Sequence, residues 1–99
     1  MIRHVVTWKL AATDDTERAE QVATIAGGLR SLPPHIPEIL SFEVGENVLH
    51  PGANFDLVLI AEYEDADALA RYQEHPEHKK VASYIRTVVA DRSAVDFEV

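Results

Sequence analysis

The sequence predicts an α+β fold of the ferredoxin-like type, in which four antiparallel strands form one sheet and helices cover one of its faces. Two observations lead to this prediction. Strand-like alternation and helix-like periodicity follow one another in the order β-α-β-β-α-β, with the second helical segment broken once. That order is the split βαβ arrangement, which places its helices on one side of the sheet. The length of 99 residues suits a single domain over residues 1–99.

The first part of the chain is expected to hold one strand and one helix. Residues 2–10 alternate between two faces, which is typical of a strand with one buried face. Residues 14–31 change to a helical period, with Asp14 as the N-cap and Glu17 three residues later completing a capping-box pattern. The residues expected on the buried face of the strand are Ile2, His4, Val6, Trp8 and Leu10.

Two adjacent glycines, Gly27 and Gly28, weaken this helix locally, and we expect them to let it approach the sheet closely. Prolines then end the helix and hold a loop. Strands are expected over residues 39–48 and 55–63, separated by turn-forming residues at 49–54.

The last part of the chain is expected to be a broken helix followed by a strand. Asp65 begins a short helix that carries Tyr72, and Pro76 ends it. A further helix is expected over 76–89 and the last strand over 92–98. The basic residues expected on the outer, solvated side of the last helix are Lys79, Lys80 and Arg86.

The third strand predicts a second copy of the chain. An antiparallel strand with one wet face alternates, but residues 57–61 are apolar throughout, so both faces are expected to be buried. Val58 and Ile60, with Val5 of the first strand, then lie on the face that no helix covers. A two-fold homodimer is the commonest way to cover such a patch. The alternative is that these are ordinary scattered surface residues.

Composition excludes several classes of partner and site. The net charge is −8, with 17 Asp and Glu against nine Lys and Arg, which argues against nucleic acid and anionic membranes as partners. The chain has no cysteine, so it has no disulfide and no thiolate, and we expect a cytoplasmic protein. We also expect neither a signal peptide nor a membrane span.

Four segments of the chain, taken in order, carry a recognisable pattern. The segments are Ile2–Val6, Ile36–Ile39 leading to Phe42–Gly45, Tyr72–His78 and Val95–Val99. The most specific is the third, with the pattern Tyr-x-x-His-Pro-x-His. Together they resemble the stress-responsive A/B barrel domain (Dabb) family. The resemblance implies a ferredoxin-like protomer whose sheet pairs with that of a second copy in a dimeric α/β barrel.

The same resemblance implies a site without a cofactor. A plant member of the family closes a linear polyketide into an aromatic acid with no cofactor. Its catalytic Tyr and His match Tyr72 and His78, and a pocket His on its first strand matches His4. A further pocket His of that enzyme falls at Leu57 here, so we do not expect the plant substrate itself.

The residues themselves also favour a small-molecule pocket between sheet and helices. Pro76 suits the first position of a helix, so His75 lies at the junction and His78 in the first turn. The helix dipole disfavours imidazolium there, so a neutral His78 can act as a base, while Tyr72 polarises a substrate oxygen. The residues expected to bind substrate beside this pair are His4, Trp8, Phe55, Leu57, Leu59 and His75.

Each of these residues also has a structural interpretation. Tyr72 can be a core aromatic, His4 a hydrogen-bonded core histidine, and the two histidines near Pro76 can bond across the helix junction. A metal site at His75 and His78 with neighbouring glutamates is a further possibility. The proline break and the lack of cysteine argue against it, and no metal site is predicted.

Three functions therefore stay open. The first is a cofactor-free enzyme that acts on a small polyketide-like or other carbonyl compound. The second is a non-catalytic dimer, stress-related or holding an apolar ligand, and the third, by analogy of fold, is a cofactor-free monooxygenase. An open cavity that reaches Tyr72 and His78 would favour the first, and a filled core would favour the second.

Overall fold

The computed structural model covers residues 1–99 and contains the elements in the predicted order. The helical segment near residue 76 is broken as expected. In chain order the elements are β1 (Ile2–Leu10), α1 (Asp15–Arg30), a 3₁₀ turn (Pro33–His35), β2 (Ser41–Glu46), β3 (Leu57–Tyr63), α2 (Ala66–Glu74), α3 (Pro76–Val88) and β4 (Val89–Glu98).

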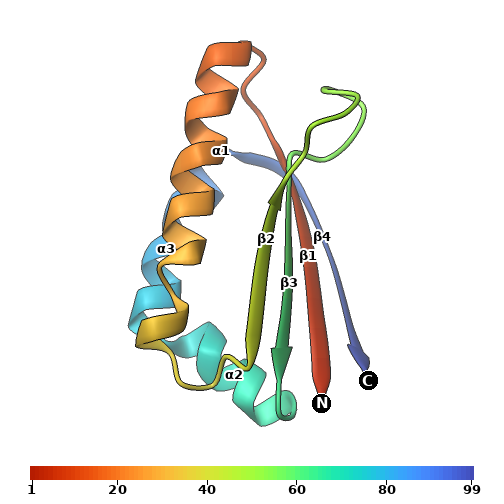
Figure 1. Ribbon diagram of the computed structural model, residues 1–99. Coiled ribbons are helices and arrows are strands. Elements are labelled where there is room, and N and C mark those ends of the chain that lie inside the picture. Colours follow the sequence, from red (N-terminus) through yellow and green to blue (C-terminus); the bar gives the residue numbers. More distant parts are fainter.

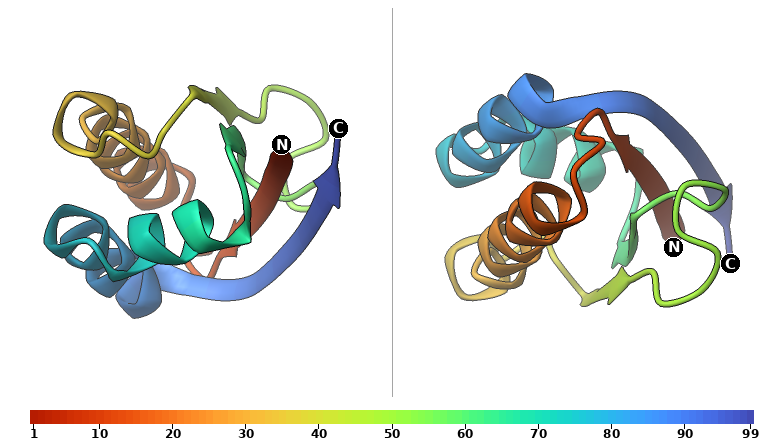
Figure 2. Two further views of the ribbon diagram at one scale, coloured as in Figure 1. Left: turned by 90° about the horizontal axis from the view of Figure 1, so that it is seen from below. Right: turned by 90° about the horizontal axis from the view of Figure 1, so that it is seen from above.

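The four strands form one antiparallel sheet with the spatial order β2-β3-β1-β4. β1 lies inside the sheet, where Val5 stands opposite Ile60 of β3 and Val95 of β4. The helices all lie on one side of the sheet, and the loop between β2 and β3 extends to the other side (Figure 1 and Figure 2). This is the ferredoxin-like fold that the sequence predicts.

The hydrophobic core lies between the sheet and the helices. On β1, buried Val6 and Trp8 alternate with half-buried Val5 and Thr7, as predicted. β3 alternates in the same way and contributes every second residue to the core. The main core residues from β3 and the helices are Leu57, Leu59, Ala61, Tyr63, Ile25, Ala26, Leu29, Leu69, Tyr72 and Ile85.

α1 begins as predicted, but two details differ. The Asp14 carboxylate accepts a hydrogen bond from the Glu17 backbone N–H at 2.8 Å. The Glu17 carboxylate accepts from Gln21 Nε2 at 3.2 Å instead of reaching back, so only half of the capping box forms. Gly28 allows a close approach to α3 and not to the sheet, because a Cβ there would lie 3.3 Å from Val81 Cγ2.

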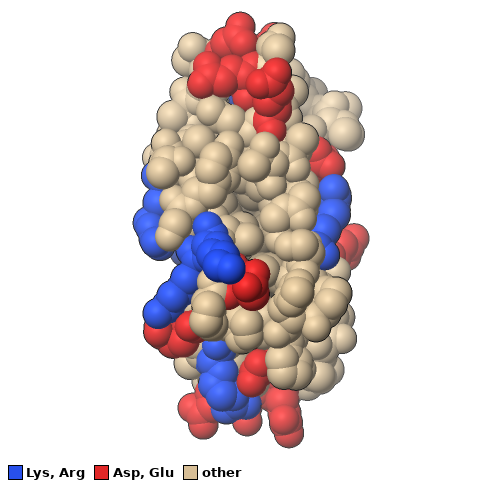
Figure 3. Space-filling view, turned by 90° about the vertical axis from the view of Figure 1, so that its left-hand side faces the viewer, with Lys and Arg blue, Asp and Glu red and all other residues tan.

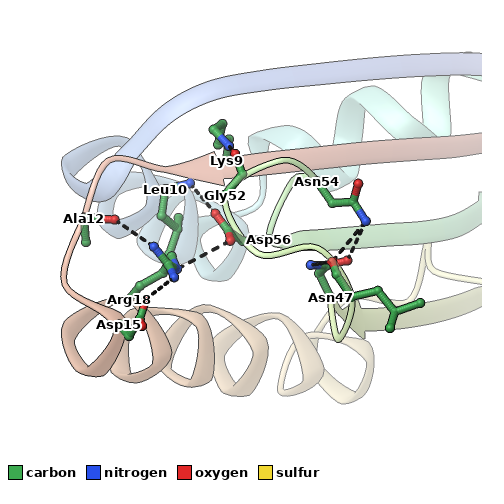
Figure 4. A network of polar contacts seen from close by, with 10 residues as sticks. Lys9, Leu10, Ala12, Asp15, Arg18, Asn47, Gly52, Asn54 and Asp56 are labelled. Atoms are coloured by element: carbon green, nitrogen blue, oxygen red, sulfur yellow. Dashed lines mark hydrogen bonds and ion pairs between the residues drawn. The ribbon is translucent and has the colours of Figure 1, made fainter.

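The start of β3 also differs from the prediction, since the strand begins at Leu57 and not at Phe55. Asp56 forms a bend, and its buried carboxylate accepts a hydrogen bond from the Leu10 backbone N–H at 2.8 Å. The Arg18 guanidinium lies 3.9 Å from the same carboxylate, which ties α1 to this corner (Figure 4). The bend interrupts the alternation of the strand, so Phe55 does not share the face of Leu57.

The last strand starts earlier than predicted, at Val89 instead of residue 92. Val89 ends α3 with an extended backbone (φ −81°, ψ 140°) and already pairs with Leu10 of β1. The helix therefore passes into the strand with no loop between them. The prediction missed this because the branched side chains of Val88 and Val89 fit either a buried helix face or a strand.

The face of the sheet that no helix covers is apolar in its centre. Val5, Val58 and Ile60 lie there, as predicted from the alternation. β4 adds two exposed apolar side chains to them, Val95 (62% exposed) and Phe97 (41%). We call these five residues the open-face patch.

Polar groups surround the open-face patch. Arg3 pairs with Glu62 at 3.2 Å, and its guanidinium lies over the Phe97 ring at 5.7 Å. At the other end of the sheet Lys9 Nζ donates to the Gly52 carbonyl oxygen at 2.9 Å. An apolar centre with a polar rim is the usual composition of a protein–protein interface.

The surface above the helices carries its charges unevenly. Asp and Glu side chains gather mainly at the two ends of the molecule, and Lys and Arg lie mostly around its middle (Figure 3). None of the helices has both the length and the apolar composition that crossing a membrane requires.

Candidate functional site

A cavity of about 300 Å³ opens between the sheet and the helices α2 and α3. Its floor comes from β1 and β3, and its walls come from α1, α2, α3 and the start of β4. Most of the lining is apolar, with a few polar side chains among it, as is usual for sites that bind small molecules. The lining residues are His4, Val6, Trp8, Leu29, Leu59, Tyr72, Gln73, His78, Val81, Ala82, Ile85, Arg86, Val89 and Arg92.

The structure brings five of the eight predicted site residues to this cavity and places three elsewhere. The five are His4, Trp8, Leu59, Tyr72 and His78. Phe55 lies beyond the bend at Asp56 and lines a separate groove on the open side of the sheet. Leu57 is buried (2% exposed) but lies nearer that groove than the cavity.

His75 is the third residue that the structure places elsewhere. It ends α2 and precedes α3, with the extended backbone that a residue before proline adopts (φ −64°, ψ 136°). Its Nδ1 accepts a hydrogen bond from the Glu77 backbone N–H at 3.1 Å, so the ring caps α3. His75 therefore caps α3 at the helix junction and does not line the cavity.

Tyr72 and His78 face each other across the helix junction. Tyr72, in the last turn of α2, is almost fully buried (1% exposed), and His78 lies in the first turn of α3. Their ring centroids are 4.5 Å apart, with an angle of 56° between the planes. Burial raises the pKa of Tyr72 to about 12, so its hydroxyl stays protonated and can donate a hydrogen bond.

The hydrogen bond of His78 fixes which ring nitrogen can accept a proton. His78 Nδ1 lies 3.0 Å from the Gln73 carbonyl oxygen, which can only accept, so Nδ1 carries the hydrogen. In the neutral ring Nε2 then holds the free lone pair. Burial lowers the pKa of His78 below 6.5, the Gln73 bond opposes this, and the positive charges of Arg86 and Arg92 add to the lowering. The ring is therefore mostly neutral at pH 7.

His4 is held by an acidic residue that the sequence analysis did not single out. Its Nδ1 donates to the carboxylate of Asp96, which stands directly opposite on β4. His4 is 3% exposed and its ring centroid lies 6.5 Å from that of Tyr72. The sequence feature that could have predicted the role of Asp96 is its position as a single carboxylate between the apolar residues Val95 and Phe97, which places it on the opposite, helix-facing side of the last strand.

Comparison with known proteins places the chain in a family. The model of the stress-responsive A/B barrel domain, Dabb, matches residues 2–99. The chain belongs to the Dabb family. Among curated proteins, the uncharacterized protein SCO4036 of Streptomyces coelicolor is 33% identical over 81 residues, which are 80% of each chain.

Solved structures related to this Dabb domain are described as dimers. A dimeric ferredoxin-like protein of unknown function from Bacteroides fragilis has a TM-score of 0.90 at 27% identity, covering 99% of this chain and 95% of that one. A dimeric ferredoxin-like protein of unknown function from Thermobifida fusca has a TM-score of 0.81 at 32% identity, covering 99% and 90%. The ferredoxin-like fold is therefore shared with dimeric relatives.

A second tyrosine lies behind the site of the Dabb domain. The Tyr63 ring centroid is 4.9 Å from that of Tyr72 and 6.2 Å from that of His4. Tyr63 is fully buried and its hydroxyl makes no hydrogen bond of normal geometry, although it lies close enough to the Tyr72 hydroxyl for each group to affect the pKa of the other. Burial raises its pKa further than that of Tyr72, so its hydroxyl also stays protonated.

Two arginines border the cavity, and the sequence analysis gave neither of them a place in the site. Arg86 was expected on the outer side of the last helix with Lys79 and Lys80. It is exposed, but it lines the cavity, whereas the two lysines pair with surface glutamates. Arg92 reaches the same cavity because it stands opposite Trp8, on the helix-facing side of β4.

Proposed function

We propose that this Dabb protein is a cofactor-independent enzyme that removes a proton next to a carbonyl group and closes a carbonyl-rich chain into a ring. The observation that carries the proposal is the pairing of Tyr72 with His78 at the wall of a largely apolar cavity. One residue is a protonated donor and the other a mostly neutral base, which is the combination that enolate formation requires.

The reaction follows from the two side chains. His78 Nε2 takes a proton from the carbon beside the carbonyl, and the electron pair of that C–H bond forms an enolate. The Tyr72 hydroxyl donates a hydrogen bond to the enolate oxygen. The enolate carbon then attacks a second carbonyl of the same molecule, which forms a C–C bond. The new alkoxide takes the proton back from His78, so no oxidant or reductant is consumed.

The remaining cavity residues have positioning roles in this proposal. Asp96 accepts a hydrogen bond from His4 Nδ1, which leaves His4 Nε2 as the ring nitrogen available to a substrate oxygen. Trp8 and Leu59 supply apolar surface that keeps the flexible chain folded near the base. The cavity reaches both Tyr72 and His78, which supports an enzyme over a dimer with a filled core.

The proposal includes assembly as a homodimer through the open-face patch. Val5, Ile60 and Val95 stand side by side on three neighbouring strands, where water would otherwise cover them. The dimeric relatives with the same fold support this assembly. Because a two-fold axis presents the same patch from each copy, the apolar centres meet and the polar rims surround them.

The test measures proton removal directly and needs no natural substrate. Ethyl 3-oxohexanoate, a neutral compound, is incubated with the protein in D₂O, and ¹H NMR follows loss of the protons between its two carbonyl groups. The acceleration is the exchange rate with protein divided by the rate without protein. We expect His78→Ala to lower this acceleration about 100-fold or more. Tyr72→Phe should lose about tenfold or more, because it removes one donor to the enolate oxygen.

The pH dependence gives a second measurement in the same experiment. Since burial lowers the pKa of His78, the neutral base persists to lower pH than a free histidine would, and the rate should fall only below pH 6.5. His35→Ala is the matched control, because that histidine is exposed on the 3₁₀ turn and lies outside the cavity. Equal exchange by wild type and a folded His78→Ala would remove His78 from the mechanism.

A further inference from the structure

The basic side chains of the protein are mostly neutralised, and the exceptions concentrate at the cavity. The chain has nine Lys and Arg residues. Six of them form ion pairs with carboxylates: Arg3, Arg18, Arg30, Arg71, Lys79 and Lys80. Of the three others, Lys9 is engaged by a backbone carbonyl on the open side of the sheet. The remaining two, Arg86 and Arg92, line the cavity.

Neither cavity arginine has a carboxylate within ion-pair distance. Arg86 donates only to the Ser83 hydroxyl, at 3.3 Å. The Arg92 backbone N–H donates to the Asp91 carboxylate at 2.8 Å, but the Arg92 guanidinium makes no hydrogen bond. Arg92 stands opposite Trp8 on the helix-facing side of β4. A guanidinium carries five donors, so both side chains keep most of their hydrogen-bonding capacity unused.

The cavity is also free of acidic residues, although the protein as a whole is acidic. Its lining contains no Asp or Glu in a chain with a net charge of −8. Asp96 lies on the same face of β4 as Arg92, but it is engaged by His4 and does not line the cavity. The positive charges of Arg86 and Arg92 are felt at His78, where they act against a protonated ring.

We propose that the cavity takes an organic anion, whose charged head group binds Arg86 and Arg92 while its carbon chain extends along Trp8 and Leu59. Planar guanidinium groups hold carboxylate and phosphate oxygens in pairs, which orients the ligand as well as binding it. This inference rests on the proposed function, since it names the substrate class of the same site. In this proposal the orientation of the substrate in the cavity is determined by its charged head group and not by its reacting carbonyl group.

Trp8 provides the measurement. It is the only tryptophan of the chain and lines the cavity, so its fluorescence reports on ligand there. The probes share a chain of similar length and differ in the head group: octanoate, octyl phosphate and the neutral methyl octanoate. We expect at least one anion to bind about tenfold or more tightly than the ester, a moderate factor because the arginines are partly solvated. The tighter anion identifies the head group.

Variants assign that preference to the two arginines. Arg86→Gln and Arg92→Gln should each weaken anion binding several-fold, the double variant should abolish the preference over methyl octanoate, and ester binding should not change. Arg71→Gln is the matched control, because it removes the same charge from an ion pair with Glu38 outside the cavity. In the wild type, rising salt should weaken binding of the anions and not of the ester.

Several results would overturn the inference. It is wrong if methyl octanoate binds as well as both anions, if neither anion changes the Trp8 fluorescence, or if Arg71→Gln weakens binding as much as the cavity variants do. Since the proton-exchange test uses a neutral ester, the two proposals can fail separately. Anion binding without exchange would refute the chemistry, and exchange without an anion preference would refute this substrate class.

Discussion

The two faces of the sheet are built from the same strands and carry opposite kinds of surface. On the helix side, His4 lies beside an open cavity and is held by Asp96. On the other side, their chain neighbours Val5 and Val95 stand opposite each other in an apolar patch. One step along either strand therefore separates a polar site from an apolar contact surface.

The difference shows how a small domain can hold a pocket without losing stability. Helices cover only one face, and part of the volume beneath them stays open. The open-face patch supplies further apolar area that a second copy can cover, and burying it would add stability that the incomplete core does not provide. We therefore expect changes on one face to affect assembly and changes on the other to affect chemistry.

The largest effect is expected from a charge in the open-face patch. Ile60→Asp places a carboxylate in the patch beside Val5, and the two-fold axis brings a second one with it. Burying unpaired charges costs several kcal/mol each, so the dimer should weaken by more than about 100-fold. Sedimentation equilibrium at micromolar concentration measures this. Ala23→Asp, which adds the same charge on the exposed side of α1, should leave the dimer intact.

That experiment also tests the assembly itself. A wild-type protein that sediments as a stable, folded single subunit would contradict the dimer. The cavity would then have to function in a protomer whose open-face patch is exposed to water, which monomers rarely tolerate.

An intermediate effect is expected from two neighbouring residues of β4. Asp96→Asn removes the charge that orients His4, and proton exchange should fall by about tenfold while the dimer is retained. Val95→Asn places the same side chain on the other face and should weaken the dimer with little change in exchange per site. For each variant, ¹H NMR measures the rate of proton exchange and sedimentation equilibrium measures the strength of the dimer. Equal behaviour of the two variants would mean that the faces are not independent.

The sequence predicts one part of this site and misses another for a physical reason. His4, Tyr72 and His78 were singled out by the resemblance to the Dabb family, and strand alternation and the Pro76 helix start then predicted which elements carry them. Arg92 and Asp96 were missed because their roles depend on the register of β4 against β1, which local patterns do not reveal.

The errors have equally local causes. Phe55 was placed on the wrong face because Asp56 forms a bend that alternation does not anticipate. His75 was placed in the cavity because its spacing from His78 was visible in the sequence, whereas its capping bond to the Glu77 N–H was not. The open-face patch was predicted in part, since Val58 and Ile60 interrupt the expected alternation on their own strand.

The smallest effect is expected from a change at Tyr63, which is buried behind the cavity residue Tyr72. The Tyr63 and Tyr72 rings are neighbours tilted by 43°, but only Tyr72 lines the cavity, and the Tyr63 hydroxyl is buried without a hydrogen bond of normal geometry. Removing an unpaired buried hydroxyl relieves a desolvation cost, so Tyr63→Phe should stabilise the protein by about 1 kcal/mol in urea unfolding. Proton exchange should stay close to the wild-type rate, in contrast to Tyr72→Phe. A loss of stability in Tyr63→Phe would mean that the hydroxyl is hydrogen-bonded in solution, and the cavity would then extend behind Tyr72.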